Sequence, residues 1–230
     1  LFLVLFLVKV PKENDENQKE SFRQYMGNMK DIFKQKGKWL SGVFMGGLVA
    51  MFVLFGFLFY FTSTLEDKYH IEGIKRGLIL AIPLLALCVS SFITGKVIGK
   101  QKSLMKWVIL IGNIVSASSL TLLSFFDNFT ILIVALSFTG IGIGAALPCL
   151  DALVTVGIEK KYRGCITCIL SSTRLLGVAT GPPFAAMLMK SNNTILFYAF
   201  VAANAISALL MFLLVKPGEG ARKNIEPTYP

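Results

Sequence analysis

Arg174 is the residue whose chemistry fits its surroundings least. It lies in the stretch SSTRLLGVATGPPF, residues 171–184, inside a run from residue 164 to residue 189 that holds no other charge. It follows Arg163 by 11 residues, a helical rise of about 16 Å, which places it near the middle of a hydrocarbon layer roughly 30 Å thick. An arginine at this depth costs on the order of 3 kcal/mol, so it usually faces a bundle interior or a water-filled cavity. We predict that Arg174 lines a pathway for substrate or ions; alternatively, it only holds helices together by binding carbonyls or a carboxylate.

Asp151 is the acidic residue closest to the interior of an apolar stretch. We expect it at the cytoplasmic depth, too far from Arg174 for the two side chains to meet. The counter-charge of Arg174 is therefore expected in the substrate or in a part of the protein outside these residues. Asp151 could instead form a cytoplasmic latch with Arg163, Lys96 or Lys100, made in one conformation and broken in another. In the alternative reading, the basic residues at 96–102 only set the topology.

Glycines and prolines in two stretches are expected to control how helices pack or bend. Small residues four apart let helix backbones approach closely, and proline removes a backbone donor and bends a helix. The predicted gating or packing residues are Gly177, Gly181, Pro182 and Pro183 in one stretch, and Gly140, Gly144 and Pro148 in the other. A packing seam without any gating role is the alternative, above all for the second stretch.

Other reactive groups give no sign of catalysis. The single histidine, His70, belongs to no metal-binding motif, and no glycine-rich phosphate loop is present. The four cysteines lie in or beside apolar segments, where cysteine behaves as a small hydrophobic residue. We therefore expect a protein that is not an enzyme and that needs no metal or cofactor.

The composition is that of a membrane protein. Hydrophobic residues make up 54% of the 230 residues and charged residues only 16%, and the mean hydropathy is +0.67, whereas soluble domains are about one quarter charged. The formal charge is +10. Because the basic residues lie in short loops between apolar runs instead of forming a stripe with aromatics, nucleic-acid binding is not expected.

Six apolar stretches are long enough to cross a bilayer as helices. They cover residues 39–65, 77–95, 107–126, 128–150, 164–189 and 191–215. We predict an all-α, polytopic six-helix bundle, with a transmembrane domain at residues 39–215. Residues 1–8 are interpreted as the tail of a truncated preceding span, residues 9–38 as a cytoplasmic central loop with an amphipathic helix, and residues 216–230 as a cytoplasmic tail.

The distribution of basic residues predicts the orientation. With residues 9–38 in the cytoplasm, 18 of the 23 Lys and Arg lie inside, Arg174 lies within a span, and four lie outside: Lys68, Lys75, Arg76 and Lys190. The C-terminus is therefore expected in the cytoplasm. Apolar residues between Phe22 and Phe33 recur at helical spacing, which indicates a helix lying on the bilayer surface; a linker helix packed on its own protein is the alternative.

One long stretch resembles two spans of a known transporter family: residues 140–188, GIGIGAALPCLDALVTVGIEKKYRGCITCILSSTRLLGVATGPPFAAML. They look like the fourth and fifth spans in the C-terminal half of a major facilitator superfamily transporter of the drug:proton antiporter branch, including the Asp151 end and the Arg163-Gly164 loop. Six spans after a basic central loop, with both ends inside, also match that half, so the resemblance covers nearly the whole chain.

Two shorter motifs match the family less completely. Its antiporter motif belongs to the fifth span of the N-terminal half, to which the present span would be the symmetry mate. The residues that match part of it are Gly177, Gly181 and Pro182. The loop at residues 95–102 resembles the family's Gly-x-x-x-Asp-Arg-x-Gly-Arg loop loosely, since Gly99 replaces the Asp and Lys102 replaces the second Gly.

The resemblance implies alternating access by two six-helix halves around a central site. It implies a bacterial plasma-membrane protein that exports small hydrophobic or amphiphilic molecules against an inward flow of protons, together with a missing N-terminal six-helix half. One alternative is a transporter of a polar or anionic metabolite, a nutrient or a siderophore-like compound, with Arg174 binding the anionic group. Another is a membrane subunit or receptor that transports nothing.

Overall fold

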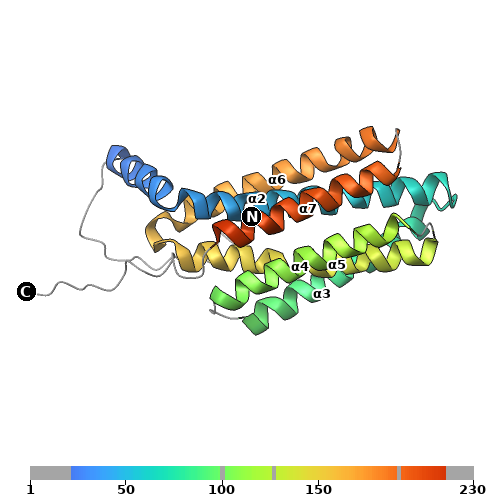
Figure 1. Ribbon diagram of the computed structural model, residues 1–230, viewed down its shortest axis with the longest axis horizontal. Helices are drawn as coiled ribbons and strands as arrows, with labels where there is room; N and C mark the ends of the chain where they lie inside the picture. The colour runs from blue at the N-terminus through green and yellow to red at the C-terminus, as the bar shows by residue number, and fades with distance from the viewer. Residues whose placement is uncertain (1–21, 99–101, 126–127, 191–192, 216–230) are drawn as a thin grey trace, which may run out of the picture. The chain divides into compact units, whose positions relative to one another are not determined.

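The computed structural model describes residues 22–98, 102–125, 128–190 and 193–215, and all regular structure in these ranges is helical. The helices are α2 (Phe22–Asp67), α3 (Gly73–Ile98), α4 (Lys102–Leu123), α5 (Phe129–Gly157), α6 (Lys160–Met189) and α7 (Asn193–Leu214). Each contains a stretch long and apolar enough to cross a membrane (Figure 1). The predicted all-α fold with six membrane-spanning helices is confirmed.

The helices extend beyond the apolar stretches from which they were predicted. α5 continues seven residues past position 150, to Gly157, and α6 begins after a short connection, at Lys160. α2 begins at Phe22, so the described part of the expected central loop belongs to the helix that continues into the first span. The boundary between two compact units falls inside this helix, after Lys36. The proposed truncated span at 1–8 and the tail at 216–230 lie outside the described residues.

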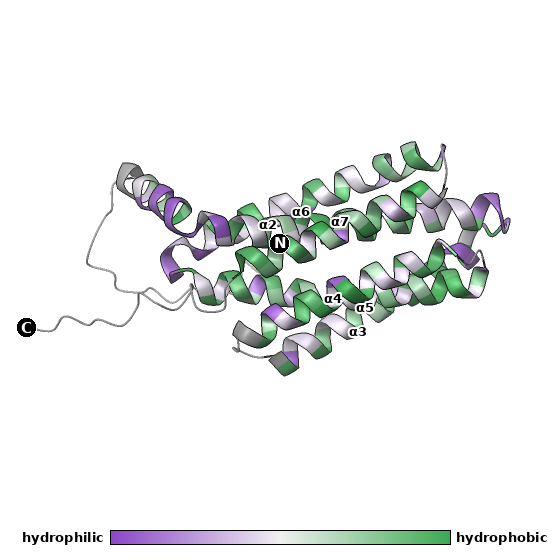
Figure 2. Ribbon diagram, in the orientation of Figure 1, coloured by the Kyte–Doolittle hydropathy of each residue, from purple (hydrophilic) through white to green (hydrophobic). Residues whose placement is uncertain are grey.

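The described interior of the second unit, which begins at Gly37, is apolar and rich in aromatic rings. Phe57 and Phe61 of α2 and Phe200 of α7 are fully buried. Phe197 meets the rings of Phe57 and Tyr60 edge to face, with centroids 6.2 and 5.0 Å apart, a favoured aromatic geometry. In Figure 2 the strongly hydrophilic colour gathers toward the ends of the helices, as expected for segments that cross a hydrocarbon layer.

Glycines bring α5 against two neighbouring helices. A Cβ added at Gly140 would lie 2.8 Å from the carbonyl oxygen of Pro83, and one at Gly144 would lie 2.5 Å from that of Leu87, both in α3. A Cβ at Gly142 would instead meet the carbonyl of Gly112 in α4. Since residues two apart point to nearly opposite sides of a helix, alternate glycines let α3 and α4 pack on different faces of α5.

Buried polar side chains join α4 and α7. Asn204 and Ser116 are fully buried, and the Asn204 Nδ2 atom donates to the Ser116 Oγ atom over 3.4 Å. Asn113 and Ser207, on the same two helices, are at most 5% exposed. Interhelical hydrogen bonds of this type stabilise association where lipid surrounds the helices, so these side chains fix which faces of α4 and α7 meet.

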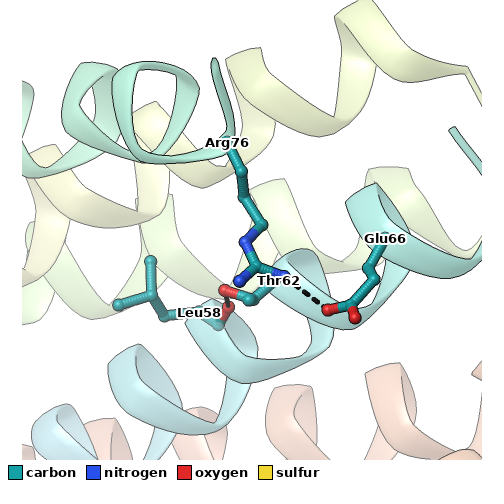
Figure 3. A network of polar contacts seen from close by, with 4 residues as sticks. All are labelled: Leu58, Thr62, Glu66 and Arg76. Carbon is teal, nitrogen blue, oxygen red and sulfur yellow. Dashed lines mark hydrogen bonds and ion pairs between the residues drawn. The ribbon is translucent and has the colours of Figure 1, made fainter. Parts of the chain in front are cut away.

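An ion pair links α2 and α3 close to the turn between them (Figure 3). The Arg76 Nη1 atom of α3 contacts the Glu66 carboxylate of α2, while the nearby Thr62 hydroxyl donates to the Leu58 carbonyl over 2.8 Å. The turn itself uses a left-handed backbone at Gly73, where φ is 62°, a conformation that glycine adopts without steric cost.

Replacing Glu66 with Gln is expected to change the stability little. The side chains of Arg76 and Glu66 are 31% and 52% exposed, and exposed ion pairs contribute about 0 to 1 kcal/mol. Thermal unfolding of the purified protein should show only a small decrease in Tm, and the decrease should shrink further at high salt. A large, salt-independent loss would contradict this view of the pair.

Candidate functional site

The centre of the candidate site is an ion pair between α5 and α6. The Arg174 Nη1 atom lies 2.9 Å from Asp151 Oδ1 and 3.1 Å from Asp151 Oδ2. The Arg174 Nη2 atom donates to the carbonyl oxygen of Leu147 over 3.3 Å. The expectation that Arg174 could not reach Asp151 is therefore wrong, and the described part of the chain supplies the counter-charge itself.

The pair forms because α5 is longer than its apolar stretch. Asp151 lies six residues before the last residue of α5, Gly157, and is therefore about 9 Å inside the helix end. Helical side chains point toward the N-terminus of their own helix, and α6 begins beside that same end. The long stem of Arg174 is thus directed back toward Asp151. The length of α5 and the direction of this stem together bring the two charged groups into contact, although their spacing in the sequence suggested that they were too far apart.

The two partners differ in their exposure. The Arg174 side chain is 15% exposed, whereas that of Asp151 is 49% exposed. The guanidinium has five N–H donors, and its Nε is buried without an acceptor among the described residues. Asp151 therefore neutralises Arg174 without using all of its donors, and about half of the Asp151 side-chain surface is left uncovered by the described residues.

Among its described members, the proposed cytoplasmic latch is not formed in this conformation. Asp151 pairs with Arg174, while the Arg163 Nη2 atom donates to the carbonyl of Ile158 over 3.3 Å. Lys96 is exposed in the last turn of α3, and Lys100 lies outside the described residues. A latch between Asp151 and any of these cations stays a prediction for another conformation.

Gly47 of α2 leaves the helix surface beside Arg174 without a side chain. A Cβ added at Gly47 of α2 would lie 3.3 Å from both the Cγ and the Nε atoms of Arg174. Gly47 was not predicted as a site residue, and its one signal in the sequence is its place beside Gly46 in an apolar span. Gly47 thus leaves room for the arginine stem between α2 and α6.

The glycine and proline stretch of α6 faces α2. A Cβ at Gly177 would collide with the carbonyl of Leu48, and one at Gly181 would lie 2.6 Å from the carbonyl oxygen of Phe52. The two backbones are therefore in contact, one helical turn beyond Arg174. α6 runs without interruption through Pro182 and Pro183, so the suggestion that these prolines and Pro148 serve gating stays a prediction.

The sequence of this chain matches a known protein family. The model of the Major Facilitator Superfamily matches residues 1–174 and 77–228, which together cover nearly the whole chain. The chain belongs to the major facilitator superfamily. This membership groups it with transporters and not with enzymes, and it agrees with the six membrane-spanning helices. The predicted C-terminal half and drug:proton antiporter branch stay predictions.

This superfamily member also has a curated bacterial relative. It is 47% identical over 209 residues to the bacillibactin exporter of Bacillus subtilis (strain 168). The alignment covers 91% of the chain and 52% of the relative, so the chain spans about half the length of that protein. The similarity to an exporter thus extends over almost all of this chain and includes both α5 and α6.

Proposed function

We propose that this chain forms one six-helix half of a small-molecule exporter that works by alternating access. The observation that supports this proposal most directly is the 47% identity to an exporter over 91% of the chain. In transporters of this architecture, substrate and coupling-ion sites lie near the bilayer midplane, between two repeats that rock against each other. A second six-helix half, in the same polypeptide or a separate one, would complete the pathway.

The Arg174–Asp151 pair is proposed to lie on that pathway. Arg174 can change partners at low cost, because an incoming anion can replace the half-exposed carboxylate beside the guanidinium. The anion would then cross while Asp151 is ionised and unpaired. After the anion is released outside, a proton would bind Asp151, cross inward and leave, and the ion pair would form again. Substrate and proton would thus cross in opposite directions.

An anionic or strongly polar substrate is favoured over a cationic one. The largely buried charge at the site is a guanidinium whose Nε donor has no acceptor among the described residues, and a guanidinium suits carboxylate, phosphate or phenolate oxygens. The name of the relative makes bacillibactin the first compound to test. Efflux of hydrophobic or amphiphilic drugs is the second candidate, and the abundance of apolar residues in the helices supports it.

The test compares these substrates in one set of cells. The transporter assembled from this chain and its partner half is expressed in bacteria that lack their own exporter of bacillibactin, and the compound is measured outside the cells. We expect secretion above the level of cells with an empty vector, and loss of secretion when a protonophore collapses the proton gradient. Export of cationic dyes without any export of bacillibactin would contradict the proposal.

A further inference from the structure

An apolar groove runs between α4 and α7, away from the Arg174–Asp151 pair. Its volume is about 580 Å³, within the range of roughly 300–1,000 Å³ found for small-molecule sites. Small residues, Ala117 of α4 and Ala205 and Ala208 of α7, line it together with large apolar side chains. Two of these large residues, Trp107 and Phe212, are more than half exposed.

The polar residues along this groove offer little to a polar ligand. The hydroxyls of Ser118 and Thr121 donate to carbonyls of their own helix, over 2.8 and 2.9 Å. Asn113 and Asn204 are at most 5% exposed, and Asn204 contacts Ser116. An aliphatic chain can therefore lie along the groove without taking hydrogen bonds from Ser118, Thr121 or the buried Nδ2 of Asn204.

A cation stands at one end of the groove. The Nζ atom of Lys106 lies 3.0 Å from the carbonyl oxygen of Phe212 and 4.9 Å from the centre of its ring. Phe212 is in the last turn of α7, where a cation is favourable. An ammonium group has three donors, so Lys106 can also bind an anion at the point where Trp107 marks the interface with water.

We propose that this groove binds an anionic phospholipid. Its phosphate would contact Lys106, and one acyl chain would lie along the groove past Ala117, Ala205 and Ala208. The lining residues of α4 extend from Trp107 to Thr121, a distance of about 21 Å along the helix, whereas one leaflet supplies about half of a roughly 30 Å hydrocarbon layer. The groove is thus long enough for a complete acyl chain, and the charge at its end selects the headgroup.

Trp107 provides a direct readout in the assembled transporter. The protein is reconstituted in vesicles containing phosphatidylglycerol or phosphatidylcholine with the same brominated acyl chains, which quench nearby tryptophan. The difference in emission between the protein and its Trp107→Phe variant isolates the signal of Trp107. We expect half-maximal quenching at a mole fraction of phosphatidylglycerol about fivefold lower than that of phosphatidylcholine, the preference that a single lysine near the surface can provide.

Two variants and a matched control test whether Lys106 and the groove cause the preference for phosphatidylglycerol. Lys106→Gln should remove it, whereas Lys160→Gln, which removes an exposed lysine at the same end of the helices, should retain it. Ala208→Phe should fill the groove and weaken quenching by both lipids while Lys106 is intact. Equal quenching by the two lipids, or equal losses in the two lysine variants, would overturn the headgroup assignment. Failure of both lipids to quench Trp107 would show that protein covers the groove and would overturn the site.

Discussion

Replacing Arg174 with Ala is expected to raise the bacillibactin concentration for half-maximal export about 10- to 100-fold, or to abolish export. The protein should still insert into the membrane. Export should suffer because a hydrogen bond to a charged group contributes about 1.5–3 kcal/mol, and Arg174 is the cation proposed to bind the substrate. Insertion should not suffer, because the change removes a charge that costs on the order of 3 kcal/mol at mid-membrane. The Asp151 carboxylate left behind is already 49% exposed.

Removing Asp151 in place of Arg174 should lower the stability of the protein. Asp151→Ala leaves a guanidinium that is only 15% exposed without its counter-charge, and a largely buried charge left without its partner destabilises the folded protein. We therefore expect lower yield and lower Tm for Asp151→Ala than for Arg174→Ala. Asp151→Asn, which keeps the shape and removes the titratable group, should reduce proton-driven export most strongly.

The measurements are initial rates of export, the amount of protein in the membrane, and Tm in detergent for all three variants. Arg174→Lys is the matched control, because it keeps the charge and loses the planar fork of donors. We expect it to transport better than Arg174→Ala and less well than the unchanged protein. Normal export by Arg174→Ala would remove Arg174 from the substrate pathway and would favour a purely structural role for the pair.

Replacing Gly177 with Ala is expected to destabilise the helix bundle more than the same change at Gly181 or Gly164, the other glycines of α6. The new Cβ would collide with the backbone carbonyl of Leu48, which cannot move without displacing α2. Overpacking of this type costs about 1–3 kcal/mol, and occasionally more. Because the contact is one turn beyond Arg174, separation of α2 and α6 would also shift the arginine relative to Asp151 and lower export.

Gly164 offers a matched control in the same helix. A Cβ at Gly164 would have no atom within 4 Å, and alanine is up to about 1 kcal/mol better than glycine in a helix interior. Gly164→Ala should therefore leave Tm and export unchanged or slightly raised. Tm is measured by following loss of the monodisperse protein on size exclusion after heating. If Gly177→Ala and Gly164→Ala had equal stabilities, the close α2–α6 contact would be disproved.

The six spans could be predicted from the sequence because each one satisfies a local physical requirement. A helix crossing hydrocarbon needs about 20 apolar residues in succession, and such runs are visible without knowledge of any neighbour. The exceptional position of Arg174 was visible for the same reason, since one charge in an apolar run is a local feature. Spacing also revealed the glycines of α5 and α6 as positions where helices come close.

Only the tertiary structure decided which residues meet. The pairing of Arg174 with Asp151 depends on where α5 ends and on the direction in which an arginine stem leaves α6, and neither follows from the ends of apolar runs. Gly47 became part of the site because α2 passes beside Arg174, and the groove between α4 and α7 exists because small residues of two distant segments face each other. Hydrophobicity acts residue by residue along the chain, whereas ion pairs and close contacts act between segments, so their partners are set by how the helices pack.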